Sequence, residues 1–104
     1  MKINFKSKKL KKKFETRKEL EKAYGTRQAK KITQRMNELY AAESLQDIKH
    51  IPSSRLHQLS GNYKTCFAID LVHPYRLIIK PEDGDIEDLR TMTLVEVVNV
   101  EDYH

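Results

Sequence analysis

The chain has few of the residues that cross-link small folds or bind metal clusters. It contains one cysteine, Cys66, with three glycines, three prolines and no tryptophan in 104 residues. A single cysteine can neither close an internal disulfide nor supply a cysteine-based zinc site. No apolar run approaches the roughly 20 residues of a transmembrane helix, and no apolar segment follows the basic N-terminus as in a secretory signal. We expect one domain, residues 1–104, located in the reducing cytoplasm without membrane contact.

The sequence also lacks the usual motifs for metals and nucleotide cofactors. The four histidines, His50, His57, His73 and His104, include no pair at helical spacing. The three glycines are too far apart to form a phosphate-binding loop. Cys66 beside a histidine would resemble a nucleophile and its base, but a small residue within a strand is more typical of a core. We therefore expect no metal and no cofactor.

Positive charge is concentrated in the first part of the chain. Of the 20 Lys and Arg residues, 14 lie in residues 1–40 beside only four acids, whereas residues 80–104 hold eight acids and two bases. A basic half suits a polyanionic partner such as nucleic acid, because each neutralised phosphate releases counterions. Lysines on the solvated faces of helices would give the same composition. From charge alone, both interpretations remain open.

The hydrophobic pattern changes its period along the chain. Residues 3–5 alternate as in a short strand. Residues 6–42 predict a basic helical hairpin in which Ser7, Thr16 and Thr26 are expected N-caps, Gly25 is an expected left-handed C-cap, and the first two segments form either two short helices or one kinked helix. Four segments with strand patterns follow: RLHQL, CFAIDLV, YRLIIK and MTLVEVVNV. This order predicts an α+β fold, with helices on one face of a mostly antiparallel sheet and the other face, which carries Arg76, partly open.

A few polar residues in these segments suit metal-free cleavage of RNA. His57 lies in RLHQL, Arg76 lies in YRLIIK, and Asp102, Tyr103 and His104 end the chain. Histidine transfers protons near neutral pH, and arginine binds phosphoryl oxygens through its planar fork. Each residue also has a structural interpretation, since His57 could simply hydrogen-bond at a strand edge and Arg76 could pair with Asp70. The residues alone leave this choice open.

Three segments, RLHQLSGN, FAIDLVHPYRLI and the terminal EDYH, together resemble the RelE/ParE toxin superfamily of bacterial type II toxin–antitoxin systems. The resemblance is to its HigB-like branch, also called plasmid maintenance system killer proteins, and spans nearly the whole chain. It implies a RelE-like, microbial ribonuclease-type α+β fold and a ribosome-dependent mRNA endoribonuclease, or mRNA interferase. It also implies the ribosome, mRNA and a HigA-like helix-turn-helix antitoxin as partners, with DNA contacted only through the antitoxin complex.

The resemblance also assigns roles to individual residues. It implies that His57 and His104 transfer protons, that Arg76 binds phosphate, and that Asp102 and Tyr103 complete the C-terminal active-site triplet. Several relatives carry a lysine where this chain has Ser60, and Lys64 is a nearby substitute. The basic helices would face ribosomal RNA, which makes the following residues RNA-binding candidates: Lys8, Lys9, Lys12, Arg27, Lys30, Lys31 and Lys64.

Two other functions compete with mRNA cleavage. A ParE-like protein of the same superfamily would poison DNA gyrase without cutting anything, although members of that branch generally lack the histidine-rich end. A catalytically weak homologue would bind RNA without cleaving it, and Ser60 favours this alternative. The process that stops first after induction, translation or DNA replication, distinguishes the gyrase poison from the nuclease.

Overall fold

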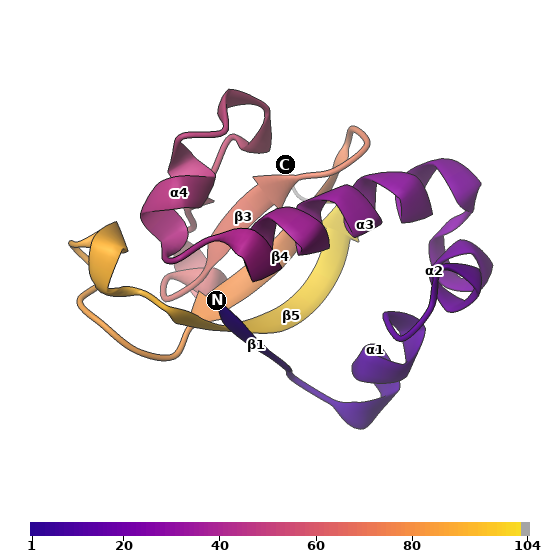
Figure 1. Cartoon of the computed structure of the whole chain (residues 1–104), viewed down its shortest axis with the longest axis horizontal. Helices are drawn as coiled ribbons and strands as arrows, with labels where there is room; N and C mark the ends of the chain where they lie inside the picture. Colours follow the sequence, from indigo (N-terminus) through magenta and orange to yellow (C-terminus); the bar gives the residue numbers. More distant parts are fainter. Residues whose placement is uncertain (103–104) are drawn as a thin grey trace.

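A computed structural model describes residues 1–102, which form a five-stranded sheet with helices against one face (Figure 1). The strand order is β1-β5-β4-β3-β2, in which β1 is parallel to β5 and all other neighbours are antiparallel. The predicted α+β fold, with a mostly antiparallel sheet, is therefore confirmed. Among residues 1–102, no helix combines the length and hydrophobicity that spanning a bilayer requires. The elements are β1 (Lys2–Phe5), α1 (Lys8–Lys13), α2 (Arg17–Tyr24), α3 (Thr26–Ala41), α4 (Leu45–Lys49), β2 (His57–Gln58), β3 (Phe67–Asp70), β4 (Tyr75–Pro81) and β5 (Leu94–Asp102).

Side-chain caps start the first two helices as predicted. The Ser7 hydroxyl accepts a hydrogen bond from the backbone N–H of Leu10, and the Thr16 hydroxyl accepts one from Glu19, both at 3.1 Å. Because Thr16 caps α2 separately, the segment contains two helices and not one kinked helix. These bonds satisfy backbone donors that have no partner within the helix.

The junction between α2 and α3 differs from the prediction. Thr26 is the first residue of α3 and not its cap, and Gly25 occupies the cap position without a side-chain hydrogen bond. Gly25 has φ 85° and ψ 162°, so it is not a left-handed helical C-cap. This conformation is almost restricted to glycine. It reverses the chain without a longer loop, so α3 starts one residue after Gly25.

The apolar face of α3 packs across the sheet and forms the main core. Ile32 and Leu39 of α3 are completely buried, and they belong to one cluster with Ile69, Leu77 and Val97 of three strands. In Figure 1, α3 crosses in front of β3 and β4 while α1 and α2 lie beside the sheet. This packing covers one sheet face along most of the length of α3.

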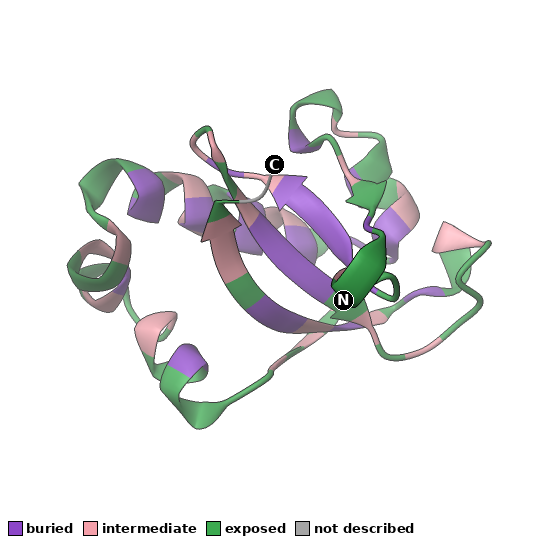
Figure 2. Ribbon diagram, turned by 180° about the vertical axis from the view of Figure 1, so that it is seen from behind, coloured by how far each residue is buried: buried purple, intermediate pink, exposed green. Residues whose placement is uncertain are grey.

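The opposite face of the sheet has its own small core. Cys66, Ala68, Ile78 and Val98 pack together there with Leu59, and in Figure 2 the strands lie in front of the helices on this side. We call it the open face. Burial raises the pKa of the Cys66 thiol, which keeps it protonated and supports a role in the core.

Two local expectations need correction. The predicted strand RLHQL is reduced to the two residues of β2, and the connection after residue 42 contains a short helix, α4. The hydroxyl of Ser44 caps α4 by accepting from the backbone N–H of Gln46 at 3.3 Å. Five residues are too few for a visible helical period, so the sequence pattern gave no signal for this element.

Asp83 ties the loop after β4 to the start of β5. Its carboxylate accepts hydrogen bonds from the Thr93 hydroxyl and from the backbone N–H groups of Thr93 and Leu94, the latter two at 2.8 and 3.0 Å. These bonds, led by the hydroxyl of Thr93, lower the pKa of Asp83 below its ordinary value of 3.8. A lowered pKa means that this stabilisation is present above the ordinary value and is lost as pH falls through the folded-state value.

We expect Asp83→Asn to lower the free energy of unfolding by about 1 kcal/mol at neutral pH, after allowance for partial solvent exposure. The neutral amide cannot accept these hydrogen bonds as a carboxylate does. Urea unfolding at about pH 7 and at about pH 3 measures the effect, which should shrink at the lower pH as the native carboxyl is protonated. A difference that is the same at both values would contradict this assignment.

Candidate functional site

An arginine cluster lies where β3 and β4 meet their connecting turn. Asp70 of β3 and Arg76 of β4 are paired across the strands, and the Arg76 Nε lies 3.1 Å from Asp70 Oδ1. The Nε of Arg55 lies 3.4 Å from the other oxygen, Oδ2. The pairing of Arg76 with Asp70, which the sequence offered as an alternative, is thus present. The carboxylate also holds two guanidinium groups, each able to bind a phosphoryl oxygen, next to each other.

His57 lies on the same face as this cluster. It is paired with Ala68 of the open-face core, and Asp70 follows two residues later on the same side of β3. The His57 side chain is exposed, and its Nδ1 is 2.8 Å from the carbonyl oxygen of Arg55. A carbonyl only accepts, so this contact assigns the proton of a neutral imidazole to Nδ1 and leaves Nε2 as the acceptor.

Arg55 contacts both His57 and the arginine cluster, and its backbone conformation is unusual. Arg55 has φ 46° and ψ 42°, a left-handed conformation that is uncommon for residues other than glycine. Its carbonyl accepts a hydrogen bond from His57 Nδ1 while its side chain reaches Asp70. Strained backbone of this kind is frequent where a fold positions functional groups. Arg55 therefore links the imidazole to the arginine cluster.

A second carboxylate balances the charge of the arginines. Glu101 of β5 is paired with Arg76 on the side opposite Asp70. The hydroxyl of Tyr63 hydrogen-bonds to Glu101, which together with burial raises the pKa of Tyr63. Oε2 of Glu101 is buried and has no hydrogen-bond partner in residues 1–102. With Arg55 and Arg76 facing Asp70 and Glu101, the cluster has almost no net charge.

Two polar side chains of α3 bind the backbone of the segments that carry the site. Arg35 is 2% exposed, and its Nε and Nη2 donate to the backbone carbonyls of Asp70 and Ser53, both at 2.8 Å. Gln28 makes a reciprocal pair with the backbone of Val72, accepting at 2.8 Å and donating at 3.2 Å. These bonds join α3 to the end of β3, to the turn after it, and to the segment leading into Arg55 and His57.

The predicted C-terminal triplet is only partly within the described structure. Asp102 ends β5 and is paired with Tyr75. Because side chains alternate along a strand, Glu101 shares the face of Arg76 and Asp102 starts on the opposite face. Tyr103 and His104 lie outside the described residues. In the described part of the chain, no three His, Cys, Asp or Glu side chains are grouped as metal ligands.

The predicted RNA-binding residues fall into three separate places. The exposed Lys8, Lys9 and Lys12 lie on α1. Lys64 precedes β3 and lines a hollow together with Lys80, whereas Asp70 is at the opposite end of that strand. The structure thus does not bring Lys64, the proposed substitute for the missing lysine at Ser60, to the Asp70–Arg76 pair. The remaining three residues, Arg27, Lys30 and Lys31, lie on α3 around a hollow next to the β3–β4 turn.

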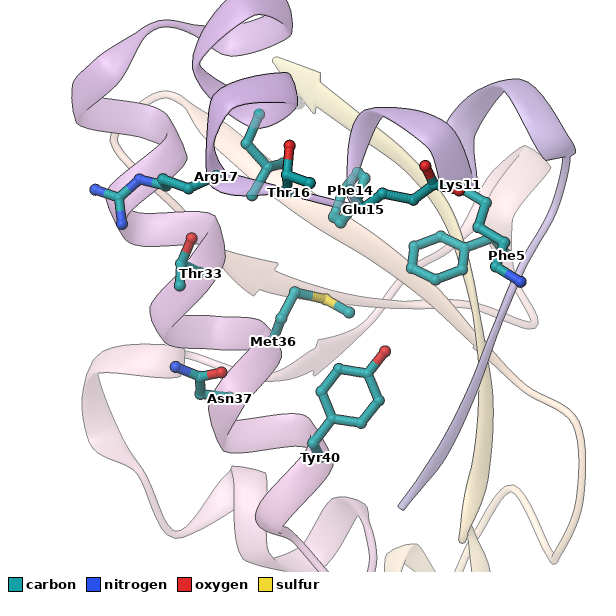
Figure 3. A pocket seen from close by; sticks show the side chains of 11 residues that line it. Phe5, Lys11, Phe14, Glu15, Thr16, Arg17, Thr33, Met36, Asn37 and Tyr40 are labelled. Atoms are coloured by element: carbon teal, nitrogen blue, oxygen red, sulfur yellow. The ribbon is translucent and has the colours of Figure 1, made fainter.

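A further hollow lies on the helical side of the molecule, between α1, α2 and α3. In Figure 3, Phe5, Phe14, Met36 and Tyr40 extend into it, and the two phenylalanine rings have centroids 5.3 Å apart. Lys11, Glu15 and Arg17 are among its lining residues. It contains none of the predicted site residues and lies among the helices, away from the open face.

Sequence reasoning missed three residues that shape the site. Arg55 and Glu101 lie inside two of the quoted segments, RLHQLSGN and EDYH, but neither was assigned a role there. Arg35 was not singled out, because an arginine is rarely buried unless it is paired. The one available signal was its position, three residues before Glu38, which is its ion-pair partner at 2.9 Å.

Comparison with known families gives one match. A family model described as a HigB-like toxin, the RelE-like toxin of the type II toxin–antitoxin system HigB, matches residues 3–91. Searches of curated proteins and of solved structures found no significant match. The matched range covers most of the chain, including His57 and Arg76, and it ends before the C-terminal triplet.

Proposed function

We propose that this chain, which belongs to the HigB-like family of RelE-like toxins of type II toxin–antitoxin systems, is a ribosome-dependent endoribonuclease that cuts messenger RNA in the cytoplasm. Membership in a type II toxin family implies a protein antitoxin as partner. We propose that this antitoxin is a HigA-like helix-turn-helix protein, and that the complex contacts DNA only through it. The observation that carries the catalytic proposal is the hydrogen bond from His57 Nδ1 to the Arg55 carbonyl, beside two arginines.

The reaction we propose is attack by the 2′-hydroxyl on the adjacent phosphorus. His57 Nε2 removes the 2′ proton, the O2′–P bond forms, and the P–O5′ bond breaks. The leaving O5′ takes a proton from His104, so that the products are a 2′,3′-cyclic phosphate and a 5′-hydroxyl. This assigns the base to His57 and the acid to His104, a choice that the sequence left open.

Arg76 and Arg55 would stabilise the charge that develops on the phosphoryl oxygens. A guanidinium has five N–H donors in a planar fork, and it stays charged throughout the reaction. The Asp70 contacts involve the Nε atom of each arginine. Asp70 would then orient the side chains of Arg55 and Arg76. A bound phosphate would compete with the Asp70 carboxylate for the two guanidinium groups. Tyr103 would stack on a base or position the substrate, with Asp102 beside it.

The test is to induce the protein in growing cells and to map the 5′ ends of cellular messages, with Arg76→Ala and His104→Ala variants in parallel. We expect new 5′ ends within translated frames for the original protein and none for either variant. The same ends in both variants would refute the assigned residues. Growth arrest without new ends and with replication stopping first would indicate the gyrase poison. Ribosome binding with intact messages would indicate the catalytically weak homologue, which Ser60 favours.

A further inference from the structure

A basic hollow adjoins the candidate site at the tip of the β3–β4 hairpin. It has a volume of about 450 Å³ and lies between α3 and the turn that follows Asp70. This volume falls within the roughly 300–1,000 Å³ of small-molecule sites. Its lining residues are Arg27, Lys30, Lys31 and Gln34 of α3 with Leu71, Val72 and His73 of the turn. Three cations, one imidazole and one amide thus surround a small apolar surface that contains no carboxylate.

Partly buried hydrogen bonds hold the walls of this hollow in place. Gln28, which is 9% exposed, both donates to and accepts from the backbone of Val72. Arg35 binds the carbonyl of Asp70 one turn of helix after Lys31. The turn therefore sits at a defined position against α3, and the cations face a preformed surface.

The cations of this hollow have no ion-pair partner among residues 1–102. Arg27, Lys30 and Lys31 form no ion pair with any carboxylate in residues 1–102, whereas Arg17 pairs with Glu21 and Arg90 with Asp88. Lys31 Nζ donates a hydrogen bond to Gln34 Oε1 at 3.2 Å. The cluster at Arg76 is nearly neutral by comparison. This hollow therefore offers a polyanion uncompensated positive charge next to the hairpin.

We infer that this hollow is a nucleotide subsite for single-stranded RNA, placed beside the phosphate held at Arg76. Arg27 and Lys31, one helical turn apart, bind a backbone phosphate, and the base lies against Val72 with the imidazole of His73 as its stacking surface. His73 lies in the turn between the strands of Asp70 and Arg76, three residues from each, so an RNA strand that crosses Arg76 on the open face reaches the hollow by passing over this turn. The inference rests on the proposed function because it assumes an RNA substrate at Arg76.

The test measures RNA binding without cleavage. The probe is a short fluorescent 2′-O-methyl RNA, which has no free 2′-hydroxyl to attack, and fluorescence anisotropy at several salt concentrations gives its affinity for the full chain. We expect Arg27→Gln combined with Lys31→Gln to lower the salt slope by about 0.7 to 1.4, the value for one or two lost phosphate contacts on a single strand. A slope equal to that of the original protein would overturn the inference.

The matched control is Lys18→Gln combined with Lys22→Gln on α2. These two lysines have the same spacing of four and the same charge, both are exposed, and neither lines the hollow. We expect the salt slope of this control to stay at the original value. Equal losses for the two pairs would mean general electrostatic attraction only, and they would overturn the subsite.

His73→Ala tests the stacking half of the inference. We expect it to weaken binding of the probe by about five- to tenfold, as loss of one modest base–aromatic contact does. The effect should disappear with a probe of the same phosphates and no bases. An equal effect on both probes would overturn the stacking role. If these binding results hold but the original protein leaves RNA intact, the subsite stands and the proposed cleavage fails. If the protein cleaves RNA but the variants bind the probe as the original does, the proposed cleavage stands and the subsite fails.

Discussion

Replacing His57 by alanine is expected to lower the rate of RNA cleavage by about 10²–10⁴-fold, the usual contribution of one general base. The side chain is exposed and lies at the end of a two-residue strand, so the substitution removes little packing. Its imidazole is oriented by the Arg55 carbonyl, which leaves Nε2 available to accept a proton. The measurement is single-turnover cleavage of message on purified ribosomes.

His50 gives a matched control for this substitution. It is also exposed, it hydrogen-bonds through its ring to Gln46 at 3.1 Å, and it lies at the end of α4. We expect His50→Ala to cleave at the original rate. Added imidazole should restore part of the activity of His57→Ala, because a free base can occupy the space that the side chain leaves, and it should not affect His50→Ala. Unchanged cleavage by His57→Ala would remove this residue from the mechanism.

The sequence predicted most of the fold because its elements are amphipathic and capped. Alternation in CFAIDLV places Phe67 and Ile69 on one side of a strand and Cys66 and Ala68 on the other, and these pairs belong to different cores on the two faces of the sheet. The caps at Ser7 and Thr16 were visible as local patterns of a few residues. Periodicity shows which side of a helix or strand is buried. This information was sufficient to predict that helices pack on one face of the sheet.

The geometry of the candidate site could not be predicted from periodicity, because the hydrogen bonds that hold it join residues that are distant in sequence. Gln28 binds Val72 and Arg35 binds Asp70, 44 and 35 positions apart. No periodic pattern distinguishes a buried polar residue that makes such a bond from one that faces water. The resemblance made His57 and Arg76 candidate site residues, but the contacts of Arg55 depend on its left-handed backbone, for which an arginine gives no sequence signal.

Arg35 connects the stability of the fold to the geometry of the site. Its guanidinium reaches the carbonyls of Asp70 and Ser53 and the carboxylate of Glu38, and it is almost completely buried. Replacing it by methionine removes the guanidinium donor from two backbone carbonyls and from the Glu38 carboxylate, which is 22% exposed. Breaking buried pairs in this way typically costs about 3–5 kcal/mol.

We therefore expect Arg35→Met to lower the free energy of unfolding by about 3–5 kcal/mol, measured by urea denaturation. The control is Arg17→Met, since Arg17 is also a helical arginine with a glutamate partner, Glu21, but its side chain is 44% exposed and the pair is 3.6 Å long. Exposed pairs of this kind contribute roughly 0–1 kcal/mol. Similar losses for the two variants would show that Arg35 does not hold the sheet to α3. A large loss for Arg35→Met alone would mean that one side chain positions the backbone carbonyls of Ser53 and Asp70, so that the geometry of the candidate site and the fold depend on the same bonds.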